Sequence, residues 1–370
     1  MKQMSSIDRM RSVFSGEMPD CVPFFPTIYT DHACLACGYR FEDALINPSL
    51  GTEHMLEAAL KYQADGVRFC LGPELRWFHD KVVREENGKL VQCDKKTGKQ
   101  EGFYDVKGGG KFIPCNPQSA VNSLSDVNMI EVMFAKEYLE KGCLETVKEC
   151  IVKAHEKRLF TVGMCSSQTI NFMVEKMGSS EIALMSFYDN PKLACALIDK
   201  AVEISIEKVK AFIKVGIDCI YIGDSYASAS VISPDIYERF CVPAYKTIVE
   251  EIHLLGVLCY KHCCGNYNPL LKSLPSIGID AMDGIDPTSG MTVKHTKDEI
   301  GSKITLMGGI SCLTLLNGTS DQVYEEAMHC VQEGKPGGRY VLGSGCAVPP
   351  NTPCKNIVAA RKAKEDHGKY

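Results

Sequence analysis

Short apolar runs rich in β-branched residues alternate along the chain with longer segments whose apolar residues recur at helical spacing. This alternation is typical of parallel strands joined by helices. Eight runs are suited to form strands, and eight parallel strands close a (β/α)8 TIM barrel. The runs are residues 22–28, 67–72, 159–164, 219–224, 258–263, 281–286, 305–310 and 340–345.

Two long amphipathic segments between these runs have the layout of barrel helices. Residues 191–215 and 234–255 each begin at a proline and end just before a glycine. Proline suits the first helical turn and glycine the position after the last. Because no Gly/Ser linker or low-complexity stretch divides the chain, we predict one α/β domain over residues 1–370, a single TIM barrel.

The stretch from about residue 78 to residue 114 departs from this repeat. The segment KVVREENGKLVQCD has two extended runs around Asn87-Gly88, a dipeptide that favours a hairpin turn. We predict a β-hairpin insertion after the second strand, on the side where TIM barrels carry their active-site loops. This placement is compatible with a lid or docking surface. It is equally compatible with a solvent-exposed insertion that has no function.

Composition and charge exclude several functions. The chain is 45% hydrophobic and 24% charged, and its 41 Lys and Arg against 46 Asp and Glu give a net charge of −5. A basic excess, which nucleic-acid binding usually requires, is therefore absent. No apolar run reaches the length of a membrane span, and the first twenty residues do not resemble a signal peptide. We expect a soluble cytoplasmic protein that binds neither nucleic acid nor membrane.

The cysteine content is high, with 19 residues at no disulfide-scaffold spacing. In a reducing compartment most of them are expected to be free thiols packed as small hydrophobic groups. Cys34-Leu35-Ala36-Cys37, with His32 nearby, is a lone Cys-x-x-Cys. It suits a redox pair, half of a metal site or plain packing, and packing is favoured because no second pair accompanies it.

The fifth run carries the sharpest chemical signal. His262 and Cys264 are two residues apart, so on an extended strand they point to the same side, whereas Cys263 points to the other. Imidazole and thiolate are ligands that zinc prefers. Gly265 allows the backbone to turn tightly behind them.

The last run supplies a third candidate ligand. Cys346 follows the strand end Gly343-Ser344-Gly345, so closure of the barrel would bring it near His262 and Cys264. Two thiolates and one imidazole leave zinc an open position, as in a catalytic site. The alternative is that these three residues bind no metal and are ordinary buried side chains. Cys354 competes for the same role, but Thr352-Pro353-Cys354 is typical of a helix start.

Carboxylates close two further runs. Asp224 would lie at the barrel mouth as a general base or substrate-binding group, unless it caps the following helix. Asp283 and Asp286 close the sixth run, and one of them is expected to orient a substrate or a ligand histidine. The residues alone do not decide which of the two does so.

These motifs resemble the uroporphyrinogen decarboxylase superfamily and, within it, the zinc-dependent corrinoid methyltransferases. The resemblance spans nearly the whole chain and rests on 262-His-Cys-Cys-Gly-Asn-266, the distal Gly345-Cys346, and Gly223-Asp224 followed by Ser233-Pro234. It implies that His262, Cys264 and Cys346 hold Zn²⁺. It also implies a methyl transfer in which the corrinoid (cobalamin) arrives on a separate carrier protein, since no segment here resembles a cobalamin-binding motif.

The decarboxylase branch of the superfamily is disfavoured. That branch uses an arginine-rich N-terminal motif to hold acidic propionate arms, whereas FFPTIYTDHACLACGYRFED offers only Arg40. A zinc triad would also have no use in that reaction.

The resemblance includes two directions of methyl transfer. In one, a methyl ether or similar donor gives its methyl group to cobalt(I); in the other, methyl-cobalt gives it to a thiol, as with coenzyme M. Aromatic residues near the predicted strand ends outnumber arginines, of which Arg68 and Arg76 are exceptions, so an aryl methyl ether is favoured. A non-catalytic zinc- or corrinoid-binding protein is the remaining alternative, and the sequence is compatible with a homodimer.

Overall fold

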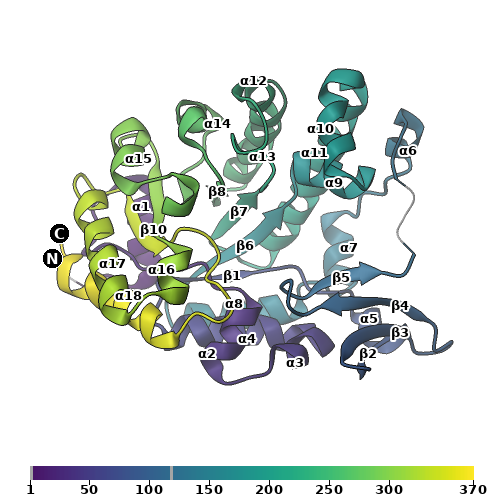
Figure 1. Cartoon of the computed structure of the whole chain (residues 1–370), viewed down its shortest axis with the longest axis horizontal. Helices are drawn as coiled ribbons and strands as arrows, with labels where there is room; N and C mark the ends of the chain where they lie inside the picture. The colour runs from purple at the N-terminus through teal and green to yellow at the C-terminus, as the bar shows by residue number, and fades with distance from the viewer. Residues whose placement is uncertain (1–2, 117–119) are drawn as a thin grey trace.

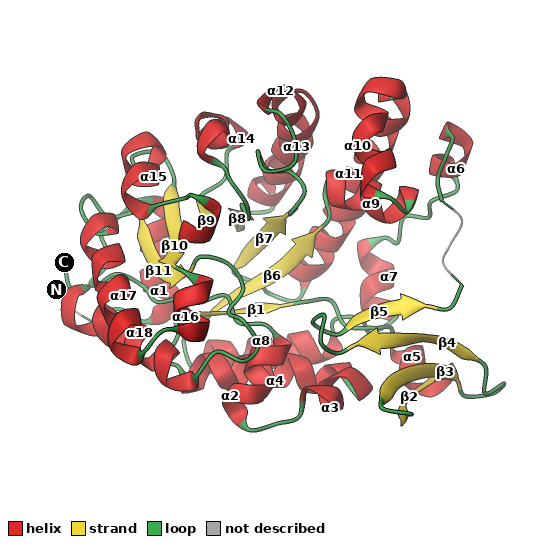
Figure 2. Ribbon diagram, in the orientation of Figure 1, coloured by secondary structure: helices red, strands yellow, loops and turns green. Residues whose placement is uncertain are grey.

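The computed structural model describes residues 3–116 and 120–370. Its centre is a parallel sheet of seven strands, in the order β1-β6-β7-β8-β9-β10-β11, curled so that its two edge strands approach each other (Figures 1 and 2). The strands are β1 (Gly66–Phe69), β6 (Phe160–Ser166), β7 (Cys219–Gly223), β8 (Leu258–His262), β9 (Ala281–Ile285), β10 (Thr305–Ile310) and β11 (Tyr340–Ser344).

The expectation of eight strands in one closed parallel sheet is wrong at the first run. Residues 22–28 make only isolated bridges to the chain around β11. Phe25 N donates to Leu342 O at 2.8 Å, and Leu342 N donates to Pro23 O at 2.9 Å. The ladder stops there because Pro23 and Pro26 have no N–H to donate.

The other side of this extended segment is fixed to the start of β1 by Asp65. Asp65 N donates to Phe24 O at 2.7 Å, and Phe24 N donates to the Asp65 carboxylate at 2.7 Å. Buried Arg9 pairs with the same carboxylate. The segment therefore occupies the gap between the edge strands β1 and β11 without being a regular strand.

Helices cover the outer face of the curled sheet (Figure 2). The predicted helix 191–215 is α11, whereas the predicted helix 234–255 is divided: Val242 N bonds back to Tyr237 O in a π turn, η1, just before Pro243. The helices are α1 (Ser6–Ser15), α2 (Thr30–Cys37), α3 (Phe41–Ile46), α4 (Pro48–Lys61), α5 (Leu75–Asp80), α6 (Leu124–Asn128), α7 (Ala135–Glu140), α8 (Glu145–Glu156), α9 (Ile170–Met177), α10 (Ser180–Asp189), α11 (Pro191–Lys214), α12 (Pro234–Ile236), η1 (Tyr237–Cys241), α13 (Val242–Leu254), η2 (Asn268–Ser273), α14 (Leu274–Ile277), η3 (Pro287–Ser289), α15 (Val293–Ile300), α16 (Cys312–Asn317), α17 (Ser320–Gly334) and α18 (Cys354–His367).

The segment after β1 forms a separate antiparallel sheet in place of the single hairpin expected there. Its four strands are β2 (Lys81–Glu86), β3 (Lys89–Asp94), β4 (Gln100–Asp105) and β5 (Lys111–Pro114), in sequential order. Asn87 and Gly88 both have positive φ at the β2–β3 turn, as a tight hairpin requires. The sheet lies beyond the carboxyl end of β1 (Figure 1).

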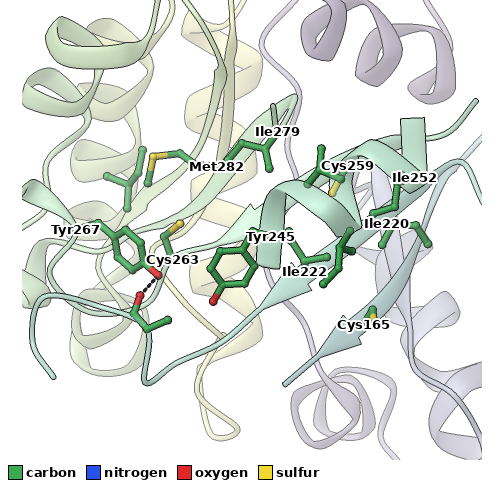
Figure 3. Close-up of a cluster of buried hydrophobic side chains, with 14 of the residues drawn as sticks. Cys165, Ile220, Ile222, Tyr245, Ile252, Cys259, Cys263, Tyr267, Ile279 and Met282 are labelled. Atoms are coloured by element: carbon green, nitrogen blue, oxygen red, sulfur yellow. Dashed lines mark hydrogen bonds between the residues drawn. The ribbon is translucent and has the colours of Figure 1, made fainter. Parts of the chain in front are cut away.

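Alternation along the strands separates two cores. Tyr221 and Tyr260 point to the inside of the curled sheet, where they pack with Val162, Met307 and Val341. Their neighbours Ile220, Ile222, Cys259 and Cys263 point outward against the helices, as Figure 3 shows for the layer between the sheet and α13. Inward-facing side chains of the strands therefore belong to the core inside the sheet, and outward-facing ones belong to the core under the helices.

Helix α1 closes the amino-terminal end of the barrel interior. Its Phe14 contacts Phe160 and Tyr260 edge-on, with ring centroids 5.9 and 6.2 Å apart. Met10 and Val13 are fully buried beside it. The opposite end, at the strands' carboxyl termini, is the end on which TIM barrels carry their sites. Among the described residues, no helix is long and apolar enough to cross a membrane.

Replacing Phe14 by alanine tests this closure. We expect Phe14→Ala to lower the free energy of unfolding by about 3–5 kcal/mol, because it leaves a cavity among rigid aromatic rings. Leu254→Ala is the control, since Leu254 is 82% exposed. Chemical denaturation measures both variants, and equal stability of the two would contradict the closing role.

Candidate active site

The structure brings His262, Cys264 and Cys346 together at the carboxyl ends of β8 and β11. The Cys346 sulfur lies 3.6 Å from His262 Nε2. Cys264 lies beside Cys346, close enough for the two thiols to hydrogen-bond. Although β9 and β10 separate the two strands in the sheet, its curl places their ends on one rim. Both cysteines are partly exposed.

Cys263 is turned away from this cluster, as the strand alternation predicts. It is fully buried, and its sulfur faces the Lys261 carbonyl oxygen at 3.7 Å. Figure 3 places it in the outer layer with Tyr267 and Met282. A thiol in this position has no access to the barrel interior.

Glycines give the two cysteines their positions. Gly265 has φ +93°, which lets the chain turn directly after Cys264. A Cβ on Gly345 would lie 2.6 Å from the Asp286 backbone, so only glycine allows the loop carrying Cys346 to pass so close to the end of β9.

A buried chain of polar groups orients His262. Its Nδ1 lies 3.3 Å from Asp283 Oδ2, and Arg68 Nη2 donates to the same oxygen at 3.3 Å. Arg68 also donates to Tyr260 Oη at 2.7 Å and to the Pro26 carbonyl at 2.9 Å. With Nδ1 engaged, Nε2 is the nitrogen that faces Cys346. Asp283 is thus the carboxylate that orients the histidine.

Asp286, the other candidate from the sixth run, has a different role. Its carboxylate accepts a hydrogen bond from Thr288 N at 3.0 Å and caps the short helix η3. It also lies near Cys312, the first residue of α16. Asp286 supports the rim beside Cys346 and does not contact His262.

The environment sets how protons are distributed over the cluster. Burial opposes the charge on His262, but hydrogen bonds with Asp283 and Cys346 outweigh it and raise the pKa of His262 to about 9. Hydrogen bonding to Cys264, with burial, raises the pKa of Cys346 to about 12, and the same contact lowers the pKa of Cys264. Although burial opposes the charge of Asp283, His262 and Arg68 keep its pKa below the ordinary value.

The donor set fits zinc in chemistry and in its one measured separation. Two bonds of about 2.0 and 2.3 Å at a tetrahedral angle place nitrogen and sulfur roughly 3.5 Å apart, close to the 3.6 Å found here. As the side chains stand, no three His, Cys, Asp or Glu groups in residues 3–116 and 120–370 form a ready-made metal cluster. To bind one metal ion together with His262, the two thiols must shift and lose the proton that they share.

Asp224 is not where the sequence interpretation put it. It shares the outward face of β7 with Ile220 and Ile222, so its side chain points into the helical layer and not into the mouth. Its carboxylate is 1% exposed and accepts hydrogen bonds from Thr169 N, Thr169 Oγ1 and Asn171 N at 2.7, 2.6 and 3.0 Å. It holds the start of α9, the helix that follows β6, instead of capping the helix that follows β7.

Lys261, which the sequence did not single out, is the buried cation on the same outer face. Its Nζ donates to Tyr267 Oη at 3.0 Å and to the His262 carbonyl at 3.3 Å, and it lies over the Tyr245 ring. Its charge opposes the rise that burial causes in the pKa of Asp224. Lys261 and Asp224 thus compensate each other behind the strand that carries His262.

The Cys-x-x-Cys on α2 lies outside the barrel interior. Cys34 is fully buried and faces His54 Nδ1 at 3.4 Å, and burial raises its pKa to about 12. His32 contacts Tyr62 Oη at 3.1 Å. Cys354 begins α18 near the same tyrosine. These contacts belong to helix packing, and the structure brings Cys346, not Cys354, to His262.

The sequence did not predict the position of three residues that surround His262 in the barrel interior. Arg68 is a charged residue within an apolar strand, which is the one signal the sequence offers. Tyr221 stacks on His262 with ring centroids 5.7 Å apart, and the hydroxyl of Tyr29 lies near Tyr221. Nothing in their spacing along the chain predicts that these residues surround the imidazole.

Comparison with known proteins identifies the family. The family model described as uroporphyrinogen decarboxylase (URO-D) matches residues 108–367. The chain belongs to the URO-D family. A solved methyltransferase from Methanosarcina mazei has the same fold as this URO-D chain, with a TM-score of 0.70, 23% identity and coverage of 98% and 99% of the two chains.

Curated relatives of this URO-D chain include methyltransferases. It is 29% identical over 178 residues to a methylated-thiol–coenzyme M methyltransferase of M. mazei, covering 48% of this chain and 46% of the relative. It is 29% identical over 196 residues to the methylcobamide:CoM methyltransferase MtaA of Methanosarcina barkeri, covering 52% and 55%. The matches thus span about half the length of these relatives. A uroporphyrinogen decarboxylase of Chlorobium luteolum is 26% identical over 263 residues, covering 68% and 72%.

Substitution of Asp224 separates a structural from a catalytic role. We expect Asp224→Ala to destabilise the fold by about 3 kcal/mol, because it leaves Lys261 without a counter-charge and frees three buried donors. Asp298→Ala is the control, since the Asp298 side chain is 58% exposed. Thermal and urea unfolding measure both. If Asp224→Ala kept full stability but lost activity, Asp224 would have a role in the reaction and not in the fold.

Proposed function

We propose that this protein is a zinc-dependent methyltransferase that moves a methyl group between a small substrate and the cobalt of a separate corrinoid protein. The observation that carries the proposal is the convergence of His262, Cys264 and Cys346 at the barrel mouth, with His262 held by Asp283. The names of the curated methyltransferase relatives support the same reaction class.

The chain's own residues supply positioning and charge. Zinc, when bound, stabilises negative charge on the oxygen or sulfur that loses or gains the methyl group. Asp283 keeps the Nδ1 proton of His262, so that Nε2 is the nitrogen that faces Cys346 and would give up its proton to bind a metal. Arg68 compensates the Asp283 charge, and α1 closes the far end of the barrel against water.

The favoured direction is methyl transfer from an aryl methyl ether or similar donor. The electron pair of cobalt(I) forms the new cobalt–carbon bond while the carbon–oxygen bond breaks. The oxygen keeps the bonding pair and takes a proton from solvent to give the phenol. The aromatic surroundings of His262, Tyr221 and Tyr29, favour a substrate of this kind.

Transfer from methyl-cobalt to a thiol is the alternative, and the relatives named as coenzyme M methyltransferases favour it. In that direction the thiolate sulfur forms a bond to carbon, and the cobalt–carbon pair returns to cobalt(I). Uroporphyrinogen decarboxylation has less support, because Arg40 is exposed and paired with Glu42 at 3.8 Å, away from any cluster of arginines. A non-catalytic zinc-binding role remains the other outcome.

Metal content tests the site. We expect one zinc per chain in the wild type, and loss of zinc in His262→Ala, Cys264→Ala and Cys346→Ala, because three ligands are the minimum for a catalytic zinc site. Cys263→Ala is the matched control and should retain zinc, since its thiol faces the outer layer. Retention of full zinc by Cys264→Ala or Cys346→Ala would remove that residue from the site.

Turnover of the wild type tests the reaction. Zinc-loaded wild type is incubated with cob(I)alamin and an aryl methyl ether, and separately with methylcobalamin and a thiol, while the cobalt absorption spectrum is followed. Turnover in the first pair supports the favoured direction, and turnover in the second pair alone supports the alternative. Zinc binding without either reaction would leave only the non-catalytic role.

Metal affinity should rise with pH. Binding must displace the protons that His262, with a pKa of about 9, and Cys346, with a pKa of about 12, hold in the metal-free chain. Between pH 6 and 8 we therefore expect the zinc affinity to increase about a hundredfold per pH unit, a factor of ten for each displaced proton. Competition with a chelator of known pH dependence measures this, and a flat profile would contradict the proposed ligands.

A further inference from the structure

The short segments between each barrel strand and the next helix carry no cationic side chain. The segments that follow the seven strands, up to the next helix, contain no lysine, arginine or histidine. They are residues 70–74, 167–169, 224–233, 263–267, 286 with 290–292, 311 and 345–353. A site that binds a sulfonate or carboxylate usually places Lys or Arg at such positions. Fixed positive charge is therefore missing where an anionic substrate would enter.

The buried arginine inside the mouth, Arg68, is already neutralised. Arg68 has a side chain only 1% exposed, and its guanidinium is bound by Asp283, Tyr260 and the Pro26 carbonyl. Asp283 is 2% exposed and shared with His262. Because a buried and paired guanidinium cannot turn toward a substrate without breaking these contacts, Arg68 provides no free anchor for an anion.

Three cations at the border between the barrel and the insertion are paired as well. Arg76, on α5, lies 2.7 Å from Glu74, and Lys141 lies 3.3 Å from the same glutamate. Lys81, on the first strand of the inserted sheet, pairs with Glu101 and Asp94. These side chains are already engaged with carboxylates at the border between the barrel and the insertion.

Uncharged aromatic and sulfur-containing groups face the mouth where lysine or arginine would be needed to bind an anion. Tyr221 covers His262, and the hydroxyl of Tyr29 lies near Tyr221, Arg68 and Cys70. Cys70 is exposed at the end of β1, and its sulfur lies 3.6 Å from that of partly exposed Met164 on β6. This soft wall, defined as Tyr29, Cys70, Met164 and Tyr221, is adjacent to the metal-ligand cluster.

We propose that the small substrate is a neutral molecule that seats its uncharged body on the soft wall. The inference rests on the proposed methyl transfer and names the charge class of its substrate. It separates this chain from enzymes that act on an anionic thiol such as 2-mercaptoethanesulfonate. A neutral methyl ether or a neutral thiol meets no unpaired group at the wall, whereas a sulfonate would lose hydration without gaining a counter-charge.

Matched substrate pairs test the charge preference. Zinc-loaded wild type is assayed with methylcobalamin and either 2-mercaptoethanol or 2-mercaptoethanesulfonate, and with cob(I)alamin and either anisole or 4-methoxybenzoate. We expect the neutral member of a reacting pair to have a kcat/KM at least about tenfold higher, after correction for thiol ionisation. An equal or higher value for the anionic member would overturn the proposal.

Calorimetric titration of the zinc-loaded protein with the two thiols measures the same preference without turnover. Tighter binding of 2-mercaptoethanol supports the inference, and tighter binding of the sulfonate, or binding of neither, overturns it. Absence of turnover with every substrate would count against the proposed function, and the titration would still decide the charge class. The two failures are therefore distinguishable.

A charge placed on the soft wall provides the matched variant test. Met164→Lys should raise the kcat/KM ratio of sulfonate to neutral thiol by about tenfold, because it supplies the missing counter-charge. Met164→Gln, polar but uncharged, should leave the ratio within twofold of wild type. Zinc content and circular dichroism verify that both variants fold. A Lys variant whose ratio does not move would overturn the role of the wall.

Discussion

The hydrogen-bonded chain from Arg68 through Asp283 to His262 is the constraint on which the candidate site depends. It crosses the barrel interior from β1 to β8, and all three side chains are buried. Removing one member would leave an uncompensated charge in a place that water does not reach, so each of the three depends on the other two. Their geometry fixes which imidazole nitrogen faces the thiols, and that in turn fixes where a metal can bind.

The strand beneath His262 has a second buried charge pair on its other face. Lys261 and Asp224 lie in the helical layer, one residue out of phase with His262 and Gly223, which are register partners. Adjacent residues of two strands therefore serve opposite purposes. The inward residues form the site, and the outward residues fix the loop that follows β8 and the start of α9. A one-residue change of register would exchange these roles.

The hydrophobic pattern predicted seven strands closely and failed where backbone chemistry overrides it. Pro23 and Pro26 interrupt a run that is apolar enough for a strand, and the extra strands of the insertion are too polar to stand out. Strand alternation predicts the shared side of His262 and Cys264, and the same rule places Asp224 on the outward face of β7 with Ile222. Arg68 could not have been paired with Asp283 from sequence, because their contact depends on how far the sheet curls.

Family membership fixes the barrel but does not fix its chemistry. Relatives named as decarboxylases and relatives named as methyltransferases share this family. In this chain Arg68 is buried and bound to Asp283, so its guanidinium is used to hold His262. The short segments that follow the strands carry no lysine, arginine or histidine. Within the described residues, a substrate's acidic group would therefore meet no unpaired lysine or arginine there, and the proposed preference for a neutral substrate depends on this placement of charge and not on the barrel itself.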